Sequence, residues 1–168
     1  MNPKILLRTA CSTIIALLLL SGCNNDVDNG LVTSVSIRDK FNQTQDTFTF
    51  ASGDEINMSL SIKNDSTSEK TLSFSDAQQY DFIIRDGDSN IIWQWSKDLI
   101  FTAVTTSFIL GPNDIQTISY TWNQNITPKT LATEDDPEIP AVPIPIGDYT
   151  LEAKFIGYDP AQTTLTID

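Results

Sequence analysis

One of the two cysteines in this 168-residue chain, Cys23, has neighbours that predict a specific covalent chemistry. Leucine, serine and glycine occupy positions 20–22, and small residues before a cysteine are what a lipoprotein signal peptidase cleaves. Upstream, Lys4 and Arg8 form a short basic region, and residues 14–20 form an uninterrupted apolar run. The order of these features predicts that the chain is cut before Cys23 and that its thiol then carries a diacylglyceryl group.

Lipidation of Cys23 would determine where the protein acts. The apolar run is much shorter than the roughly 20 residues that a membrane-spanning helix needs, whereas two or more acyl chains such as palmitate anchor a protein stably. We therefore expect a cleaved signal peptide over residues 1–22 and a lipid-anchored protein of the bacterial cell envelope. Because Asn24 and not an aspartate follows the cysteine, the periplasmic face of the outer membrane is favoured in a Gram-negative cell. The alternative is an ordinary secretory signal with a cysteine there by chance.

The side chains that carry most nucleophilic and metal chemistry are missing from the predicted mature chain. The sequence has no histidine, and its other cysteine, Cys11, lies in the leader. This excludes Ser-His-Asp and Cys-His catalysis, zinc sites built on His or Cys, and a disulfide within the mature chain. Adjacent acids at 54–55 and 135–136 favour a solvated surface, because glycoside hydrolysis needs two carboxylates facing each other across a cleft. We expect no cofactor and no enzymatic activity, and carboxylate catalysis is the one enzymatic alternative left open.

The charge of the chain restricts its partners. The full sequence has a net charge of −12, and the leader holds two of its ten basic residues and no acidic one. Eight basic residues then remain against 22 acidic ones, a net charge of about −14. Such a protein repels nucleic acid and anionic lipid headgroups. We expect no nucleic-acid partner, and attachment to the membrane only through the N-terminal lipid.

A short acidic motif has the spacing of a calcium loop. Asp86, Asp88 and Asn90 match its first three ligands. An EF-hand needs a glycine next and a glutamate at its last position, where this chain has Ile91 and Lys97. The motif therefore favours a polar hairpin turn, and no metal site is expected.

Alternation of apolar and polar residues with a period of two recurs along residues 31–168 and predicts strands. The expected strands contain, in chain order, Thr33 to Ile37, Ile56 to Ile62, Leu72 to Phe74, Tyr80 to Ile84, Ile91 to Trp95, Phe108 to Leu110, Ile118 to Trp122, Tyr149 to Phe155 and Thr163 to Ile167. Turn residues separate these runs, and no segment has the period of a long helix. We predict one all-β, immunoglobulin-like antiparallel β-sandwich over residues 31–168, preceded by a lipidated flexible tether at residues 23–30.

One segment, residues 123–146, is too long and too irregular for an ordinary connection. It is acidic and proline-rich, and three of its prolines recur every three residues, the period of a polyproline II helix. A stiff extended segment loses little entropy on binding, so we expect it to contact a partner protein. The candidate contact residues are Pro137, Ile139, Pro140, Val142, Pro143 and Ile144. The alternative is a solvent-exposed spacer or an edge segment packed along the sheet.

Three aromatic residues could form either an exposed recognition patch or part of the core. Trp93 and Trp95 alternate with Gln94 and so share one face of a strand, with Phe101 a few residues further on. A shared face suits burial, so core packing is favoured.

Several short motifs occur in an order typical of one protein family. They are Ser73-Phe74-Ser75, Gln79-Tyr80-Asp81-Phe82, Ile92-Trp93-Gln94-Trp95-Ser96, Phe101, Leu110-Gly111-Pro112, Trp122 and Gly147-Asp148-Tyr149-Thr150-Leu151. In order and spacing, residues 53–155 resemble the BsuPI-type intracellular proteinase inhibitor family. The resemblance implies an immunoglobulin-like sandwich that acts as a proteinase inhibitor or as another protein-binding module.

The chain departs from this family in two respects. It carries an export signal, so an intracellular proteinase is not the expected target, and its segment before Gly147 is longer. No inhibitory residue is transferred from the family. The expected function is that of a non-enzymatic, envelope-anchored protein-binding module, a proteinase inhibitor by resemblance. The alternative is a structural or assembly scaffold that docks on another envelope protein.

Overall fold

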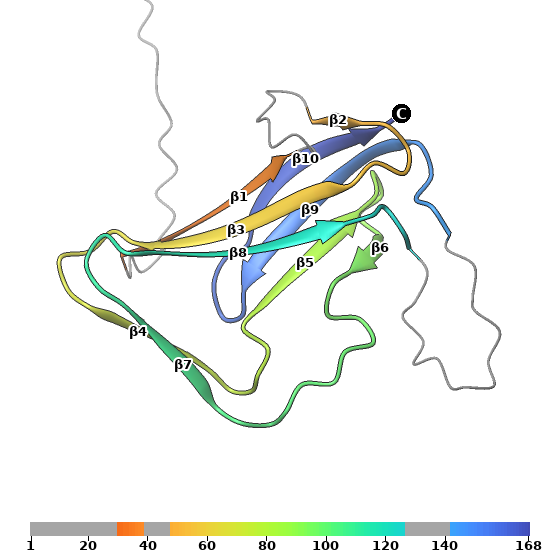
Figure 1. Cartoon of the computed structure of the whole chain (residues 1–168). Coiled ribbons are helices and arrows are strands. Elements are labelled where there is room, and N and C mark those ends of the chain that lie inside the picture. Colours follow the sequence, from red (N-terminus) through yellow and green to blue (C-terminus); the bar gives the residue numbers. More distant parts are fainter. Residues whose placement is uncertain (1–29, 39–47, 127–141) are drawn as a thin grey trace, which may run out of the picture.

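Ten strands make up the part of the chain that the computed structural model describes, residues 30–38, 48–126 and 142–168. A three-stranded sheet has the order β1 (Leu31–Arg38), β3 (Ile56–Asn64), β8 (Ile115–Trp122). A five-stranded sheet has the order β2 (Thr49–Phe50), β10 (Ala161–Ile167), β9 (Gly147–Phe155), β5 (Tyr80–Arg85), β6 (Ile91–Gln94). A two-stranded ladder pairs β4 (Lys70–Phe74) with β7 (Thr106–Leu110) beyond the ends of β3 and β8 (Figure 1).

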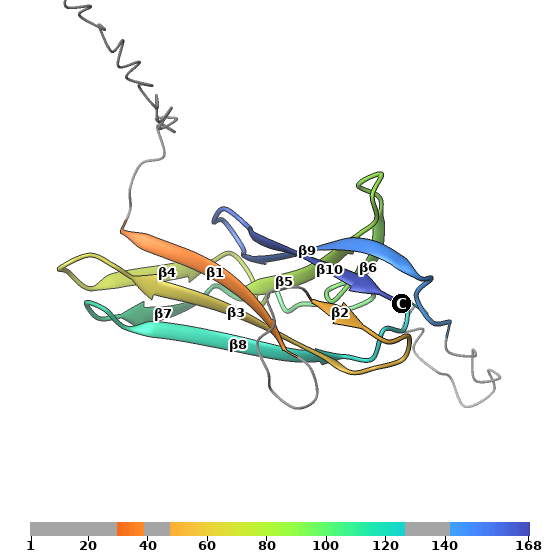
Figure 2. The same ribbon diagram turned by 90° about the horizontal axis from the view of Figure 1, so that it is seen from above.

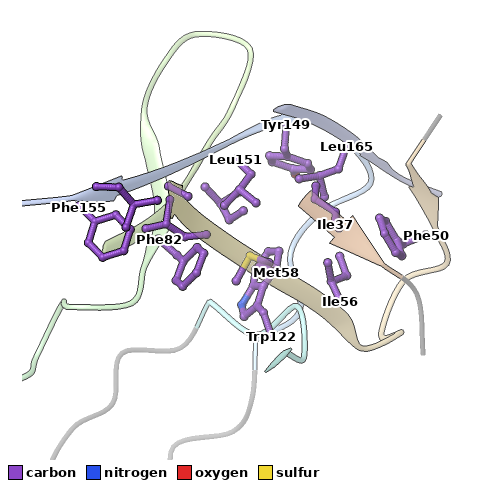
Figure 3. Close-up of a cluster of buried hydrophobic side chains, with 14 of the residues drawn as sticks. Ile37, Phe50, Ile56, Met58, Phe82, Trp122, Tyr149, Leu151, Phe155 and Leu165 are labelled. Atoms are coloured by element: carbon purple, nitrogen blue, oxygen red, sulfur yellow. The ribbon is translucent and has the colours of Figure 1, made fainter. Parts of the chain in front are cut away.

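The two larger sheets lie in separate layers, which are seen edge-on in Figure 2. Side chains of β3 alternate between buried and half-buried along its whole length, and Ile56, Met58, Leu60 and Ile62 point into the core. Tyr149, Leu151 and Phe155 of β9 belong to the same core and are drawn with Ile56 and Met58 in Figure 3, and Ala153 of β9 is buried as well. Because a strand sends successive side chains to opposite faces, each sheet supplies one apolar face. The predicted all-β sandwich is confirmed.

The nine runs with a period of two correspond to nine of the strands. Two details differ from the sequence-based expectation. Trp95 was expected in a strand, but β6 ends at Gln94, and Trp95 begins a turn in which Lys97 donates to the carbonyl of Gln94. The second difference is β2, a two-residue strand that pairs in parallel with the end of β10 and is too short to produce a periodic signal. In the ranges that the structure describes, no helix has the length and apolar composition needed to cross a bilayer.

A buried asparagine joins the sandwich to the β4–β7 ladder. Asn64, at the end of β3, is fully buried, and its side-chain Nδ2 donates to the carbonyls of Ser68, Leu110 and Gly111 at 2.8, 2.9 and 3.0 Å. Its Oδ1 accepts from the backbone N–H and the hydroxyl of Ser66. One side chain therefore satisfies backbone groups of both connections that lead to the ladder.

We expect Asn64→Leu to lower the free energy of unfolding by about 2 kcal/mol, because the loss of the amide leaves partly buried backbone groups without partners. Urea unfolding measures the change. Asn57→Leu is the matched control, since Asn57 lies on the partly exposed outer face of the same strand and its Oδ1 accepts from the Thr121 hydroxyl. An equal loss in the two variants would contradict the assignment of Asn64 as the joining residue.

Candidate functional site

The two described ends of the proline-rich segment pair with each other. We call this pairing the neck; it consists of residues 124–126 and 142–144. The N–H of Ile126 donates to the carbonyl of Val142 at 2.9 Å, and the N–H of Ile144 donates to the carbonyl of Gln124 at 2.8 Å. Between these two bonds, Asn125 and Pro143 form an isolated antiparallel bridge. The chain thus enters and leaves the segment 127–141 at one place (Figure 1).

The neck is fixed to the body of the protein by two side chains. Gln124 is fully buried; its Nε2 donates to the carbonyl of Ala51 at 3.0 Å, and its Oε1 accepts from the N–H of Gly53 at 2.8 Å. The indole Nε1 of Trp122 donates to the carbonyl of Asn125 at 3.2 Å. Gln124 therefore ties the neck to the turn before β3, and Trp122 satisfies a backbone carbonyl on the 124–126 side of the neck.

The structure corrects one of the predicted contact residues. The side chain of Ile144 is only 2% exposed and belongs to the hydrophobic core, so it presents no surface to a partner. Val142 and Pro143 are exposed, in agreement with a surface position. Pro137, Ile139 and Pro140 lie outside the described residues, as does the lipidation residue Cys23.

Both tryptophans pack against the core as expected, Trp93 from β6 and Trp95 from the turn that follows it. The ring of Trp93 lies 5.2 Å from that of Trp122 and 5.7 Å from that of Tyr120, between the two sheets. The ring of Trp95 stacks on Tyr80 at 4.3 Å, and both are partly buried against the core. Burial, and to a lesser degree the neighbouring Tyr120, raises the pKa of Tyr80 above its ordinary value of 10.0, so the phenol is neutral at physiological pH. These rings provide packing area and do not form an exposed patch.

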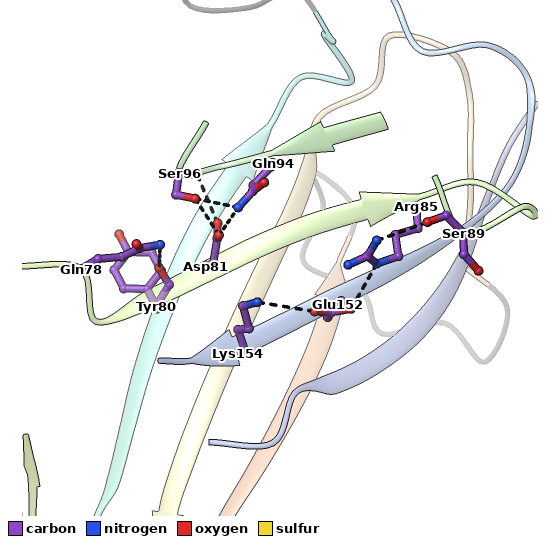
Figure 4. A network of polar contacts seen from close by, with 9 residues as sticks. All are labelled: Gln78, Tyr80, Asp81, Arg85, Ser89, Gln94, Ser96, Glu152 and Lys154. Carbon is purple, nitrogen blue, oxygen red and sulfur yellow. Dashed lines mark hydrogen bonds and ion pairs between the residues drawn. The ribbon is translucent and has the colours of Figure 1, made fainter. Parts of the chain in front are cut away.

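A buried carboxylate lies beside the end of β6 (Figure 4). Asp81 is 1% exposed, and its Oδ2 accepts from Gln94 Nε2 and from the Ser96 hydroxyl, both at 2.6 Å. Its Oδ1 accepts from the backbone N–H of Ser96 at 3.1 Å. All three donors belong to residues 94–96, so Asp81 fixes the backbone where the chain leaves the five-stranded sheet. A buried carboxylate needs this many donors, because its desolvation is costly.

The residues that follow form a segment that sequence reasoning did not select. We call residues 97–105 the β6–β7 segment. It contains Leu99, Ile100 and Val104, all exposed, and the side chain of Ile100 is 92% exposed. Phe101, by contrast, packs on Trp95 with a ring separation of 5.9 Å. The signal that could have identified it is the run Leu99 to Phe101, which is apolar without a period of two.

The far end of this segment is also held. The carbonyl of Thr102 accepts from the N–H of Ala77 at 3.0 Å and from that of Val104 at 2.8 Å. Next to it, the hydroxyl of Thr106 donates to the carbonyl of Asp76 at 3.0 Å and accepts from Gln79 Nε2. The connection before β5 therefore supports the β6–β7 segment from one side (Figure 1).

The acidic motif after β5 forms the expected hairpin turn between β5 and β6. Asp86 Oδ1 accepts from the N–H groups of Asp88 and Asn90 at 3.0 and 2.8 Å, and its Oδ2 accepts from Asn90 Nδ2 at 3.0 Å. The carboxylate is thus used inside its own turn. Among the described residues, no group of three or more His, Cys, Asp and Glu side chains could hold a metal ion.

This turn gives a pH-dependent prediction. The side-chain hydrogen bond from Asn90 lowers the pKa of Asp86 below its ordinary value of 3.8; burial opposes the shift, and the N–H groups of Asn90 and Asp88 add to it. Since the folded state holds this proton more weakly, the carboxylate stabilises the fold above pH 3.8, and this contribution is lost as the pH falls through the lowered pKa. We expect Asp86→Asn to unfold at lower urea than wild type near about pH 6, with the difference shrinking below pH 3.8.

An NMR titration of the Asp86 carboxyl carbon checks the cause. Asn90→Ala is the control and should move the midpoint back toward 3.8, because it removes the largest cause of the shift. A wild-type midpoint at or above 3.8 would show that the turn does not stabilise the carboxylate.

The outer faces of both large sheets are polar. On the five-stranded sheet, Glu152 accepts from Arg85 Nε at 3.2 Å and lies 3.8 Å from Lys154 Nζ (Figure 4). On the three-stranded sheet, the hydroxyls of Ser59 and Ser119 pair at 2.8 Å. These hydroxyls bond to each other and not to a general base, so their arrangement is that of a cross-strand pair and not that of an activated nucleophile.

Comparison with solved structures gives matches of low identity. A β-glucosidase from Listeria innocua is 8% identical with a TM-score of 0.42, over 80% of this chain and 16% of that chain. A β-glucosidase from Erythrobacter marinus is 11% identical with a TM-score of 0.43, over 82% and 16%. The DNA glycosylase AlkC of Pseudomonas fluorescens is 10% identical with a TM-score of 0.42, over 82% and 30%. The chain therefore spans less than a third of each of these proteins, and no curated protein matches its sequence.

A family model matches far more of the chain. The model described as BsuPI, intracellular proteinase inhibitor, covers residues 43–158. The match runs from the residues before β2 to the end of the β9–β10 turn and includes the Asp81 network, the tryptophans and the neck. Its extent agrees with the resemblance that the sequence motifs indicate between residues 53 and 155. Since it spans well over half of the sequence, this chain belongs to the BsuPI intracellular proteinase inhibitor family.

Proposed function

We propose that this protein is a non-enzymatic proteinase inhibitor, anchored in the bacterial cell envelope by a lipid on Cys23. The observation that carries the inhibitor function is membership of the BsuPI family over residues 43–158. The lipid anchor rests on the leader, with its basic region, short apolar run and small residues before Cys23. The expected target is a proteinase on the same side of the membrane, outside the cytoplasm.

The fold supports a binding role more than a catalytic one. The buried polar side chains Asn64, Asp81 and Gln124 are each engaged in holding backbone segments, and Glu152 lies between two cations. These contacts fix surface segments in place, and a rigid surface binds a partner with less loss of entropy than a mobile one. This is the property that an inhibitor shares with other protein-binding modules.

The inhibitor function is tested with the chain from residue 24 onward. This chain keeps every hydrophobic side chain that is buried among the described residues, since the first of them is Ile37. It is titrated against serine, cysteine and metallo-proteinases while its intact mass is followed. Inhibition that saturates at a fixed stoichiometry with the mass unchanged supports the proposal. Digestion without inhibition of any enzyme contradicts it and favours the envelope scaffold.

The anchor is tested separately in a Gram-negative host. Mass spectrometry of the full-length protein should show an N-terminal acylated Cys23, and Cys23→Ser should release the protein from the membrane fraction. A wild-type protein that is recovered without lipid would contradict the anchor and leave the inhibitor function untouched.

A further inference from the structure

We propose that the β6–β7 segment is the proteinase-binding element of this protein and that Ile100 enters the primary specificity pocket of a proteinase that accepts aliphatic side chains. This inference rests on the proposed inhibitor function and specifies its site. It selects a different place from the proline-rich segment that the sequence indicated.

The first argument is the contrast between adjacent side chains. Ile100 is 92% exposed, whereas the ring of the next residue, Phe101, packs on Trp95 at 5.9 Å. A single exposed isoleucine is ordinary in a protein surface, but here it lies among Leu99 and Val104, which are exposed as well. Three aliphatic side chains of one short segment are therefore available to a partner while its aromatic residue holds the segment to the core.

The second argument is that both ends of the segment are fixed. Before it, the buried carboxylate of Asp81 holds Ser96 through a backbone and a side-chain hydrogen bond, at 3.1 and 2.6 Å. Between the exposed side chains of Ile100 and Val104, the carbonyl of Thr102 accepts from the N–H of Ala77 at 3.0 Å, and just after the segment the hydroxyl of Thr106 donates to the carbonyl of Asp76 at 3.0 Å. A buried carboxylate is costly to keep, and its donors here all lie where the segment begins. Such clamping lowers the entropy lost on binding, which is what a tight inhibitor requires.

The third argument concerns the backbone. Within the part of the chain that the structure describes, the backbone groups of Ile100 and Phe101 make no hydrogen bond, although residues on both sides do. Proteinases bind an extended chain partly through main-chain hydrogen bonds and place one side chain in a specificity pocket. An exposed aliphatic side chain on a backbone with free donors and acceptors fits both requirements.

The anchoring of Phe101 also explains how such a segment could resist turnover. If the enzyme cleaves the peptide bond between Ile100 and Phe101, Phe101 is still held to the body of the protein by its contact with Trp95. Separation of the two ends would need that aromatic contact to break. The segment would therefore remain bound in place as an inhibitor and would not leave as a product.

The experiment uses the chain from residue 24 and three serine proteinases with pockets for aliphatic, aromatic and basic side chains. We expect the wild type to inhibit the enzyme with the aliphatic pocket best. Ile100→Lys should weaken that inhibition by about 30-fold or more and create inhibition of the enzyme with the basic-residue pocket. Ile115→Lys places the same charge at a different exposed isoleucine, on β8, and should change the inhibition of neither enzyme.

The outcomes separate this inference from the proposed function. If the wild type inhibits but Ile100→Lys behaves like Ile115→Lys, the site is wrong while the inhibitor function stands. If the wild type inhibits none of the three enzymes and also no cysteine or metallo-proteinase, both fail. Rapid cleavage of the wild type after Ile100 without inhibition identifies a substrate and overturns the site. Urea unfolding of both variants shows that neither result comes from loss of the fold.

Discussion

Replacement of Trp122 with alanine is expected to lower the free energy of unfolding by about 3–5 kcal/mol. Trp122 is 1% exposed and is among the largest fully buried side chains of the described residues. Its loss removes apolar contacts inside the sandwich and leaves a cavity that the surrounding strands cannot fill. Trp93, which packs against it at 5.2 Å, would lose its partner ring (Figure 3 shows the position of Trp122). Denaturant unfolding followed by circular dichroism gives the value.

Trp122→Phe is the matched variant, because it keeps an aromatic ring but loses the indole N–H that donates to Asn125. We expect it to cost much less than the alanine variant, and we expect hydrogen exchange to accelerate at Ile126 and Ile144, whose N–H groups pair across the neck. Equal stability of the alanine variant and the wild type would mean that the sheets do not pack as described. Unchanged exchange in the phenylalanine variant would mean that the neck does not depend on Trp122.

Replacement of Asp81 with alanine is the second large effect that we expect. The variant removes the acceptor of the Ser96 N–H and of the Ser96 hydroxyl from a position that is itself 1% exposed, and it leaves the Gln94 amide with only its bond to the Ser96 hydroxyl. Hydrogen bonds to a charged group contribute more than neutral ones, so we expect a loss of about 3 kcal/mol in urea unfolding. Asp81→Asn keeps one acceptor and should recover part of this loss.

The Asp81 variants also bear on binding. If Asp81 fixes the β6–β7 segment, the alanine variant should lose inhibition under conditions where it is still folded, and the asparagine variant should recover part of it. Hydrogen exchange at the Ser96 N–H should be slowest in the wild type, faster in the asparagine variant and fastest in the alanine variant. Arg85→Ala is the control, because Arg85 lies on the outer face of the same strand and pairs with exposed groups and with Glu152. A loss of inhibition in Arg85→Ala equal to that in Asp81→Ala would remove the argument for a specific clamp.

Arg85→Ala should have a small effect on stability. Its bond to Glu152 is partly exposed to solvent, and ion pairs of this kind contribute about 0–1 kcal/mol. The contrast with Asp81 shows how environment decides the value of a charge. Both residues lie on β5, but Asp81 is almost inaccessible to water and Arg85 is half-buried. Arg85 can therefore exchange its protein partners for water when they are lost, whereas Asp81 cannot.

The sequence alone determined the class of fold and showed which reactive side chains the chain lacks. The period of two is a local property, because each strand residue points to the opposite face from its neighbour, so Met58 and Leu60 reveal their strand without knowledge of its partners. The absence of histidine and the placement of Cys11 and Cys23 are likewise readable directly. The motif of Asp86 to Asn90 predicted its hairpin turn because the hydrogen bonds involved join residues at most four apart.

Only the tertiary structure decided which irregular residues are buried and which are exposed. Ile144 looked like a surface residue of a proline-rich segment, but its pairing with Gln124, and the bonds of Gln124 to Ala51 and Gly53, place it in the core. Ile100, which no sequence-based expectation singled out, is almost fully exposed. In both cases burial depends on contacts between residues far apart in sequence, which no local period encodes. Strands can be read from their own alternation, whereas the connections that carry binding acquire their exposure from the core that holds their ends.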